Sequence, residues 1–188
     1  MILTDREIQM ALESGAIVID PAPGAKAYSS TTVDLTLDST LNIFASDLTG
    51  EETILDPSVD GFDHEAVLAK HSKQEAIATG GYLFQPKEMI LAWTKEYVEL
   101  PAHGKVAARV EGKSSLARLG ISIHLTAPTI HAGFKGQIRL EMMNHGKHPI
   151  RLRTGMRICQ LIFEMTTGTP VLGYKGRFSG QSAATRKG

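Results

Sequence analysis

Short apolar runs, separated by glycines and prolines, fill the chain beyond Gly81 and limit the folds that it can adopt. Several of these runs alternate apolar and polar residues, which is the pattern of a strand with one buried face. The runs are YLF, MILAWT, VELP, KVAARV, ISIHLT, QIRLEMMN, IRLR and MRICQLIFE. Many short strands with turn residues between them are typical of a β-sandwich or a β-barrel, so we expect a mainly β fold.

The N-terminal residues predict one short helix beside these strands. Thr4 and Glu7 have the spacing of a capping box, in which each side chain bonds the other residue's backbone N–H. Leu3 and Ile8 are spaced to pack together across the first turn. We therefore predict a helix over residues 4–14.

Residues 46–80 are more polar than the rest of the chain. Within them, residues 63–70 predict a small peripheral helix, and the segment HSKQEAIATG is expected to be a mobile, charged approach to the strands. We interpret this stretch as an excursion from a single domain that spans residues 1–188. The last residues, SAATRKG, are small, polar and basic, so we expect a flexible C-terminal arm over about 174–188.

Composition argues against several classes of protein. Twenty basic and twenty acidic residues give a formal net charge of zero, so no overall field favours nucleic acid or an anionic membrane. No apolar run reaches the roughly eighteen residues of a membrane span, and the N-terminus lacks the basic flank of a signal peptide. The single cysteine, Cys159, allows no intrachain disulfide and is expected to be buried. We expect a cytoplasmic protein.

The segment Gly112 to Arg118 has the features of an anion-binding turn. A glycine ends a strand and two hydroxyls precede a short helical turn, which would present backbone N–H groups to an anion. Lys113 supplies a mobile charge, whereas Arg118 offers a planar fork that can hold two oxygens. The alternative is an ordinary serine-capped turn with solvated charges. The segment lacks the upstream glycine of a Walker loop.

Glu141 is the candidate general base. It ends QIRLE inside an alternating strand, where Ile138, Leu140 and Met142 share one face and Glu141 lies on the other with Arg139. In a half-buried position, desolvation would raise the pKa of Glu141 and the neighbouring guanidinium would lower it. Such a carboxylate can exchange protons near neutral pH. The alternative is a surface glutamate paired with a cross-strand arginine.

The order of three segments adds a resemblance to a known family. GKSSLARLG, then HLTAPTIHAGFKGQIRLE, then YKGRFSGQ resembles the deoxycytidine triphosphate (dCTP) deaminases, which belong to the trimeric dUTPase superfamily. The likeness extends to SSTTVDLTL and FQPKEMILAWTKEYVELP, and so covers most of the chain. It implies a dUTPase-like distorted barrel or sandwich and a homotrimer with shared active sites.

The resemblance also implies roles for individual residues. Glu141 would activate a water that attacks C4 of cytosine and would then protonate the departing ammonia, while Ser114 helps to hold that water. Arg118 would steady the catalytic cluster. The implied substrate-binding residues are Lys113, Ser114, Ser115, Leu116, Ala117, Arg118, Ala127, His131, Arg139, Leu140, Tyr174, Arg177 and Gln181. The last three match an arm that closes over the nucleotide, often in a neighbouring subunit, with Phe178 packing beside them.

Three positions depart from the family pattern. His131 stands where the family usually has an aspartate near the deoxyribose, which argues against strong phosphohydrolase activity; the alternative is a solvent-exposed turn histidine. Thr129 stands where single-function deaminases usually have arginine and two-function members a large apolar residue. Lys113 replaces a more usual arginine, which keeps the charge but loses the bidentate geometry.

The metal-ligand pattern of the zinc deaminases is missing from the sequence. Those enzymes need H-x-E with P-C-x-x-C, whereas Cys159 is the one cysteine and the histidines lack a closed ligand spacing. We therefore expect no zinc and no metal ligand from protein side chains. Mg²⁺ would arrive with the nucleotide triphosphate.

Three functions fit these observations. The leading one is hydrolytic deamination of dCTP to dUTP and ammonia, which supplies dUTP for dUMP and dTTP synthesis. The second is a dUTP diphosphatase, or a two-step enzyme that converts dCTP through dUTP to dUMP and pyrophosphate. The third is a non-catalytic sensor that binds dCTP, dUTP or dTTP. The intact Glu141 disfavours the sensor, because binding needs no poised base.

Overall fold

The computed structural model describes residues 1–44, 54–172, 174 and 180–183, and has 42% strand and 14% helix. The predicted mainly β class is confirmed. In chain order the strands are Val18–Asp20 (β1), Tyr28–Ser29 (β2), Thr32–Phe44 (β3), Ser72–Ala76 (β4), Tyr82–Phe84 (β5), Met89–Glu99 (β6), Val106–Gly112 (β7), Ile121–Ser122 (β8), Thr129–Ile130 (β9), Lys135–Asn144 (β10), Ile150–Leu152 (β11) and Arg157–Met165 (β12).

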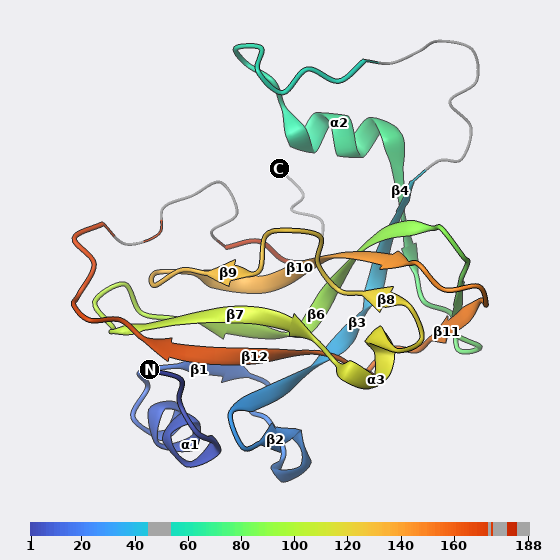
Figure 1. Ribbon diagram of the computed structural model, residues 1–188. Helices are drawn as coiled ribbons and strands as arrows, with labels where there is room; N and C mark the ends of the chain where they lie inside the picture. Colours follow the sequence, from blue (N-terminus) through green and yellow to red (C-terminus); the bar gives the residue numbers. More distant parts are fainter. Residues whose placement is uncertain (45–53, 173, 175–179, 184–188) are drawn as a thin grey trace.

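One curled antiparallel sheet contains most of these strands, in the order β8-β10-β6-β3-β12-β7-β9 (Figure 1). The long strand β3 pairs with β12 through its first half and with β6 through its second, so it joins the two halves of the curl. Strands β5 and β11 form a separate two-stranded sheet. The curl surrounds one core, to which nearly every strand contributes alternate apolar side chains.

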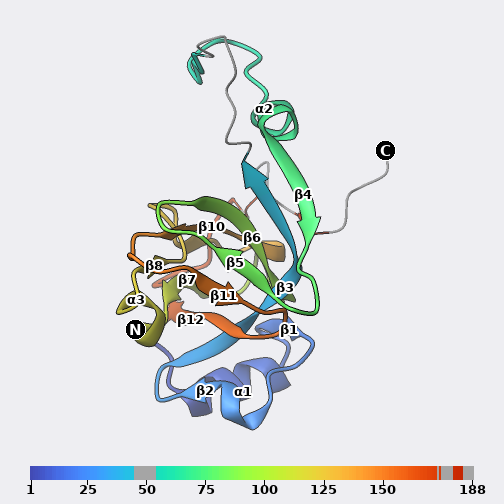
Figure 2. The same cartoon turned by 90° about the vertical axis from the view of Figure 1, so that its right-hand side faces the viewer.

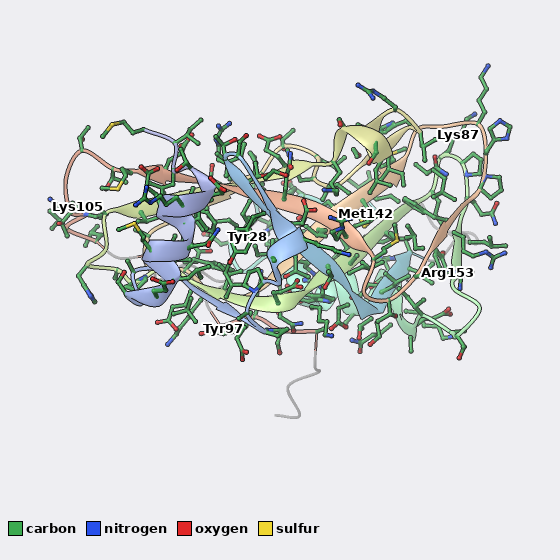
Figure 3. The ribbon with its side chains drawn as sticks, turned by 90° about the horizontal axis from the view of Figure 1, so that it is seen from below. Tyr28, Lys87, Tyr97, Lys105, Met142 and Arg153 are labelled. Atoms are coloured by element: carbon green, nitrogen blue, oxygen red, sulfur yellow. The ribbon has the colours of Figure 1, made fainter. Side chains whose placement is uncertain are left out.

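The core explains the strand pattern in the sequence. On β10, residues 136, 138, 140, 142 and 144 are buried and the residues between them are partly exposed, as the alternation predicts. Met142 lies among the side chains inside the fold, whereas Lys87 and Lys105 extend outward at opposite ends of the molecule (Figure 3). Cys159 is fully buried, as expected.

The predicted N-terminal helix is present as α1, Asp5–Glu13. Thr4 is its N-cap, and the capping box with Glu7 is formed. Leu3 and Ile8 are both buried in the main core, which fixes the helix against the sheet.

The predicted peripheral helix is also present, as α2, His64–His71, with the Asp63 carboxylate accepting bonds from the first-turn N–H groups. The following segment is not a mobile approach, and this expectation was wrong. Residues 72–76 form β4, which pairs with residues 40–44 of β3. β12 pairs with β3 only as far as Thr36, which leaves the edge of residues 40–44 opposite β6 open, and β4 satisfies that edge.

Three strand boundaries differ from the prediction. MILAWT and VELP are one strand, β6, because a register shift opposite Gln137 and Arg139 accommodates the polar residues between them. ISIHLT is a strand only at Ile121 and Ser122, since the chain then turns toward Glu141. Thr129 and Ile130 form the unpredicted strand β9, which pairs with β7.

Among the described residues, no helix is long and apolar enough to cross a membrane.

Candidate active site

A cavity of about 600 Å³ lies between α2 and the strands β9 and β10. Figures 1 and 2 both show α2 standing off one end of the curled sheet, beyond the ends of β3 and β4. The apolar lining includes Phe44, Leu55, Phe62, Val67, Leu68, Met89, Leu91, Val110, Ile130, Phe134, Ile138 and Leu140. The polar lining is His64, Glu65, His124, Thr129, His131, Arg139, Glu141 and Gln181. A mainly apolar cavity with a few convergent polar groups is typical of a small-molecule site.

Glu141 lies half-buried on the cavity side of β10. Burial raises the pKa of its carboxyl above the ordinary value. The backbone N–H groups of Glu141 and Leu125 and the charges of His124 and Arg139 act in the opposite direction. The influences expected from the sequence, desolvation and a neighbouring guanidinium, are therefore both present, and the geometry suits a carboxylate that gains and loses a proton.

Arg139 lies two residues before Glu141 and is held on two sides. Its Nη1 is 3.1 Å from the Glu65 Oε1 of α2, and its Cζ lies 4.8 Å from the centroid of the Trp93 ring. Trp93 is directly opposite Arg139 in the register of β6 and β10. A guanidinium over an indole face gains a cation–π interaction. The side chain therefore joins the wall of β-strands to α2.

His131 follows β9 in an exposed turn at the cavity. Its ring stacks on that of Tyr174, with the centroids 5.5 Å apart and an interplanar angle of 20°. The Tyr174 N–H donates to the Ala132 carbonyl oxygen at 3.0 Å. His131 is thus exposed, as the alternative interpretation expects, and it also lines the cavity.

The described residues near the C-terminus pack against β10 of their own chain. The Gln137 N–H donates to the Gln181 carbonyl oxygen at 3.0 Å, and the Ala183 N–H donates to the Gln137 Oε1 at 2.7 Å. Gly136 has a φ of +144°, and a Cβ there would lie 2.7 Å from the Gln181 carbonyl oxygen. A side chain at Gly136 would therefore collide with this segment.

The short helical turn expected within Gly112 to Arg118 is present as α3, Ser114–Ala117. It is not an ordinary serine-capped turn, because its N-cap is Lys113 and the cap makes no side-chain hydrogen bond. The Lys113 Nζ is 2.5 Å from the Oδ1 of the buried Asp34, whose Oδ2 is 3.3 Å from an Arg157 nitrogen. Ser114 and Arg118 are exposed.

None of residues 113–118 lines the cavity that contains Glu141. Figures 1 and 2 show α3 at a different part of the molecule from α2. Within one chain, the predicted triphosphate and water-holding residues are therefore separate from the predicted base.

Residues 2–166 of the chain match the dCTP deaminase-like family. The chain belongs to this family. The resemblance proposed from the sequence is therefore confirmed over most of the length.

Relatives in the dCTP deaminase-like family have two kinds of name. A protein of Methanobrevibacter smithii named dCTP deaminase, dUMP-forming, is 37% identical over 92% of this chain and 84% of its own length. A protein of Persephonella marina with the same name is 37% identical over 98% of this chain and 95% of its own. A protein of Shewanella frigidimarina named dCTP deaminase is 37% identical over 95% of this chain and 91% of its own.

A solved structure supports the fold of this family member. The crystal structure of 2′-deoxycytidine 5′-triphosphate deaminase from Agrobacterium tumefaciens superposes with a TM-score of 0.66 and 22% identity. The match covers 87% of this chain and 48% of that chain, so this chain spans about half the length of that protein. The fold is therefore similar to that of a solved dCTP deaminase.

The residues predicted from the family likeness divide into two groups in this dCTP deaminase-like chain. Those that line the cavity are Ala127, His131, Arg139, Leu140, Glu141, Tyr174 and Gln181. Those that do not are Lys113, Ser114, Ser115, Leu116, Ala117 and Arg118. Arg177 and Phe178 lie outside the described residues.

Sequence reasoning missed three contributors to the cavity. His124 is one of the histidines without a closed metal-ligand spacing, and nothing in the sequence connects it to Glu141, yet its charge acts on that carboxyl. Glu65 and Phe62 were placed in a peripheral excursion, and nothing local in the sequence indicates that this excursion returns to β10. In the part of the chain that the structure describes, no group of three or more His, Cys, Asp or Glu side chains is arranged to hold a metal ion.

Proposed function

We propose that the protein hydrolyses dCTP to dUTP and ammonia. The observation that carries this proposal is Glu141, a half-buried carboxylate with a raised pKa in a cavity of nucleotide size. Membership in the dCTP deaminase-like family and the names of the relatives support the same substrate.

The proposed chemistry is general acid–base catalysis by one side chain. The Glu141 carboxylate takes a proton from water as the water oxygen bonds to C4 of cytosine. The protonated Glu141 then delivers that proton to the amino group, the C4–N bond breaks and ammonia leaves. Of the two water protons, one ends on ammonia and the other on N3 of the uracil product. The apolar lining excludes other water from the base.

We further propose that the site is completed by a second subunit of a homotrimer. Residues 113–118 carry two hydroxyls, a lysine and an arginine suited to a triphosphate, but they lie away from the Glu141 cavity of their own chain. In a trimer with shared sites, α3 of one subunit would meet the cavity of the next. Ser114 would then hold the attacking water and Arg118 the polar groups around it.

Mg²⁺ would be bound through the nucleotide. Among the described residues, no acidic cluster is arranged as a metal site, whereas triphosphate oxygens and water are the ligands that Mg²⁺ prefers. Its contribution would be to reduce the negative charge of the triphosphate.

A second candidate function is favoured by the dUMP-forming relatives of Methanobrevibacter smithii and Persephonella marina. In this two-step reaction, deamination is followed by hydrolysis to dUMP and pyrophosphate. His131 counts against the second step, because an imidazole does not replace a carboxylate that activates water.

Product analysis tests these functions. Purified protein is incubated with dCTP or dUTP and Mg²⁺, and ammonia, pyrophosphate and nucleotides are quantified. Ammonia with dUTP supports the proposed deaminase, and ammonia with pyrophosphate and dUMP supports the two-step enzyme. Nucleotide binding with no product contradicts both enzymatic functions and leaves the sensor.

A substitution tests the mechanism. Glu141→Gln should keep nucleotide affinity and lose at least about a hundredfold in deamination rate.

A further inference from the structure

Helix α2 forms one wall of the candidate site although little holds it there. No residue of α2 is buried. Phe62, Val67 and Leu68 are partly exposed and line the cavity on this side. Since few apolar contacts fix α2, a single polar contact with the opposite wall has a large effect on its position.

The Glu65–Arg139 ion pair is such a contact. Arg139 is the fixed partner, because its side chain is 16% exposed and its guanidinium rests over the Trp93 ring. Glu65 is the movable partner, because its side chain is 55% exposed and it belongs to α2. The pair crosses from α2 to the strand that carries Glu141.

We propose that Glu65 is a positioning residue for the candidate site, and that its ion pair with Arg139 holds α2 over the cavity in front of Glu141. This inference rests on the proposed deaminase function and assigns a role within that site to the 54–71 segment. Glu65 acts through Arg139 and is not a catalytic residue.

The ion pair changes the surroundings of Glu141 in two ways. It keeps α2 in place, which limits the access of water to the cavity, and it neutralises the guanidinium that lies beside Glu141. Among the described residues, the other titratable groups that line the cavity with Glu141 are His124 and His131 from the loops beside β9, His64 from α2, and Tyr174. Both effects favour the protonated form of Glu141, so loss of the pair should favour the carboxylate.

The first test uses the free protein without nucleotide. Hydrogen exchange of the α2 amides is compared between wild type, Glu65→Gln and the control Glu75→Gln, which breaks the exposed Lys73–Glu75 pair on β4. We expect exchange in α2 to be about two- to fivefold faster in Glu65→Gln, the range for one partly exposed ion pair, and unchanged in the control. Equal exchange in the two variants would overturn the proposal.

The second test is the pH profile of kcat/KM for dCTP deamination. Glu65→Gln should move the acid limb to lower pH, and Glu65→Asp, which keeps a carboxylate, should shift it by less. An unchanged acid limb in a variant with faster α2 exchange would reject the positioning role and leave a structural one. If wild type does not deaminate dCTP, the proposed function fails, and the exchange experiment still decides whether the ion pair positions α2.

Discussion

At the scale of single residues, a carboxylate in a mainly apolar cavity keeps its proton more tightly than one in water. Glu141 is in this situation, and His124 and Arg139 moderate the effect without reversing it. A group with a raised pKa can act as a base and then as an acid at similar pH. The same property links Glu141 to the stability of the fold.

Glu141→Gln should change how stability depends on pH. Because the folded-state pKa is raised, the protonated group favours the folded state, and this contribution is lost as pH rises from the unfolded pKa through the folded pKa. The variant lacks this titration. We expect the melting temperature of the variant minus that of wild type to increase as pH rises through this window. A constant difference across the pH range would contradict a raised Glu141 pKa.

Lys113→Met should destabilise the protein even without nucleotide. The Asp34 side chain is 4% exposed and is bonded by Lys113 and by the more exposed Arg157, so the variant leaves a buried carboxylate poorly paired. We expect the free energy of unfolding in urea to fall by about 1–3 kcal/mol. Lys73→Met, at an exposed pair, is the control and should change it by less than about 0.5 kcal/mol. Equal effects would show that the Asp34 cluster contributes little.

At the scale of elements, Asn144 joins β10 to its neighbours. It is fully buried, its Nδ2 donates to the carbonyl oxygens of Phe84 and His148, and its Oδ1 accepts from the Gly146 N–H. The residue thereby ties the large sheet to the β5–β11 pair. Its side chain satisfies three backbone groups at once.

Asn144→Ala should therefore be among the more damaging single substitutions. Three backbone groups lose their partner, and we expect the free energy of unfolding to fall by about 2–4 kcal/mol, measured by urea denaturation. Ser122→Ala, which removes an exposed contact with His145, is the control and should have little effect. A smaller loss of unfolding free energy for Asn144→Ala than for the control would show that Asn144 does not link the two sheets.

The sequence predicts the elements better than their boundaries. Alternation on β10 and the capping box of α1 are local signals, and both elements form as predicted. The fusion of two runs into β6 depends on a register shift against β10, and β4 exists because β3 needs a partner. These contacts join residues far apart in the chain, so no local pattern contains them.

At the scale of the whole molecule, the candidate site also depends on contacts between residues that are far apart in the chain, and these are hard to predict from the sequence. Family likeness identified seven residues that now line one cavity, including Glu141 and Tyr174. It could not indicate that Glu65 would meet Arg139, because the excursion has no periodic signal toward a particular strand. The separation of α3 from the cavity is likewise invisible in a linear sequence.

Subunit complementation tests a site shared between chains. Glu141→Gln and Arg118→Ala proteins should each be nearly inactive as deaminases. Mixed trimers, formed by co-expression in equal amounts, should regain about one quarter of the wild-type deaminase activity. Each site takes Glu141 from one subunit and α3 from its neighbour, and in a random mixture about half of the subunits carry each intact residue. Purified mixtures of preformed trimers are the control. Mixed trimers that stay inactive would contradict the shared site.

Helix α2 is connected to the sheet at the paired ends of β3 and β4. Glu141, in contrast, lies in the middle of the sheet, where β10 pairs with β6. Sequence drift in residues 54–71 therefore leaves the hydrogen-bonded frame around the acid intact. The mouth of the cavity can thus change shape from one variant to another while the backbone that carries Glu141 stays the same.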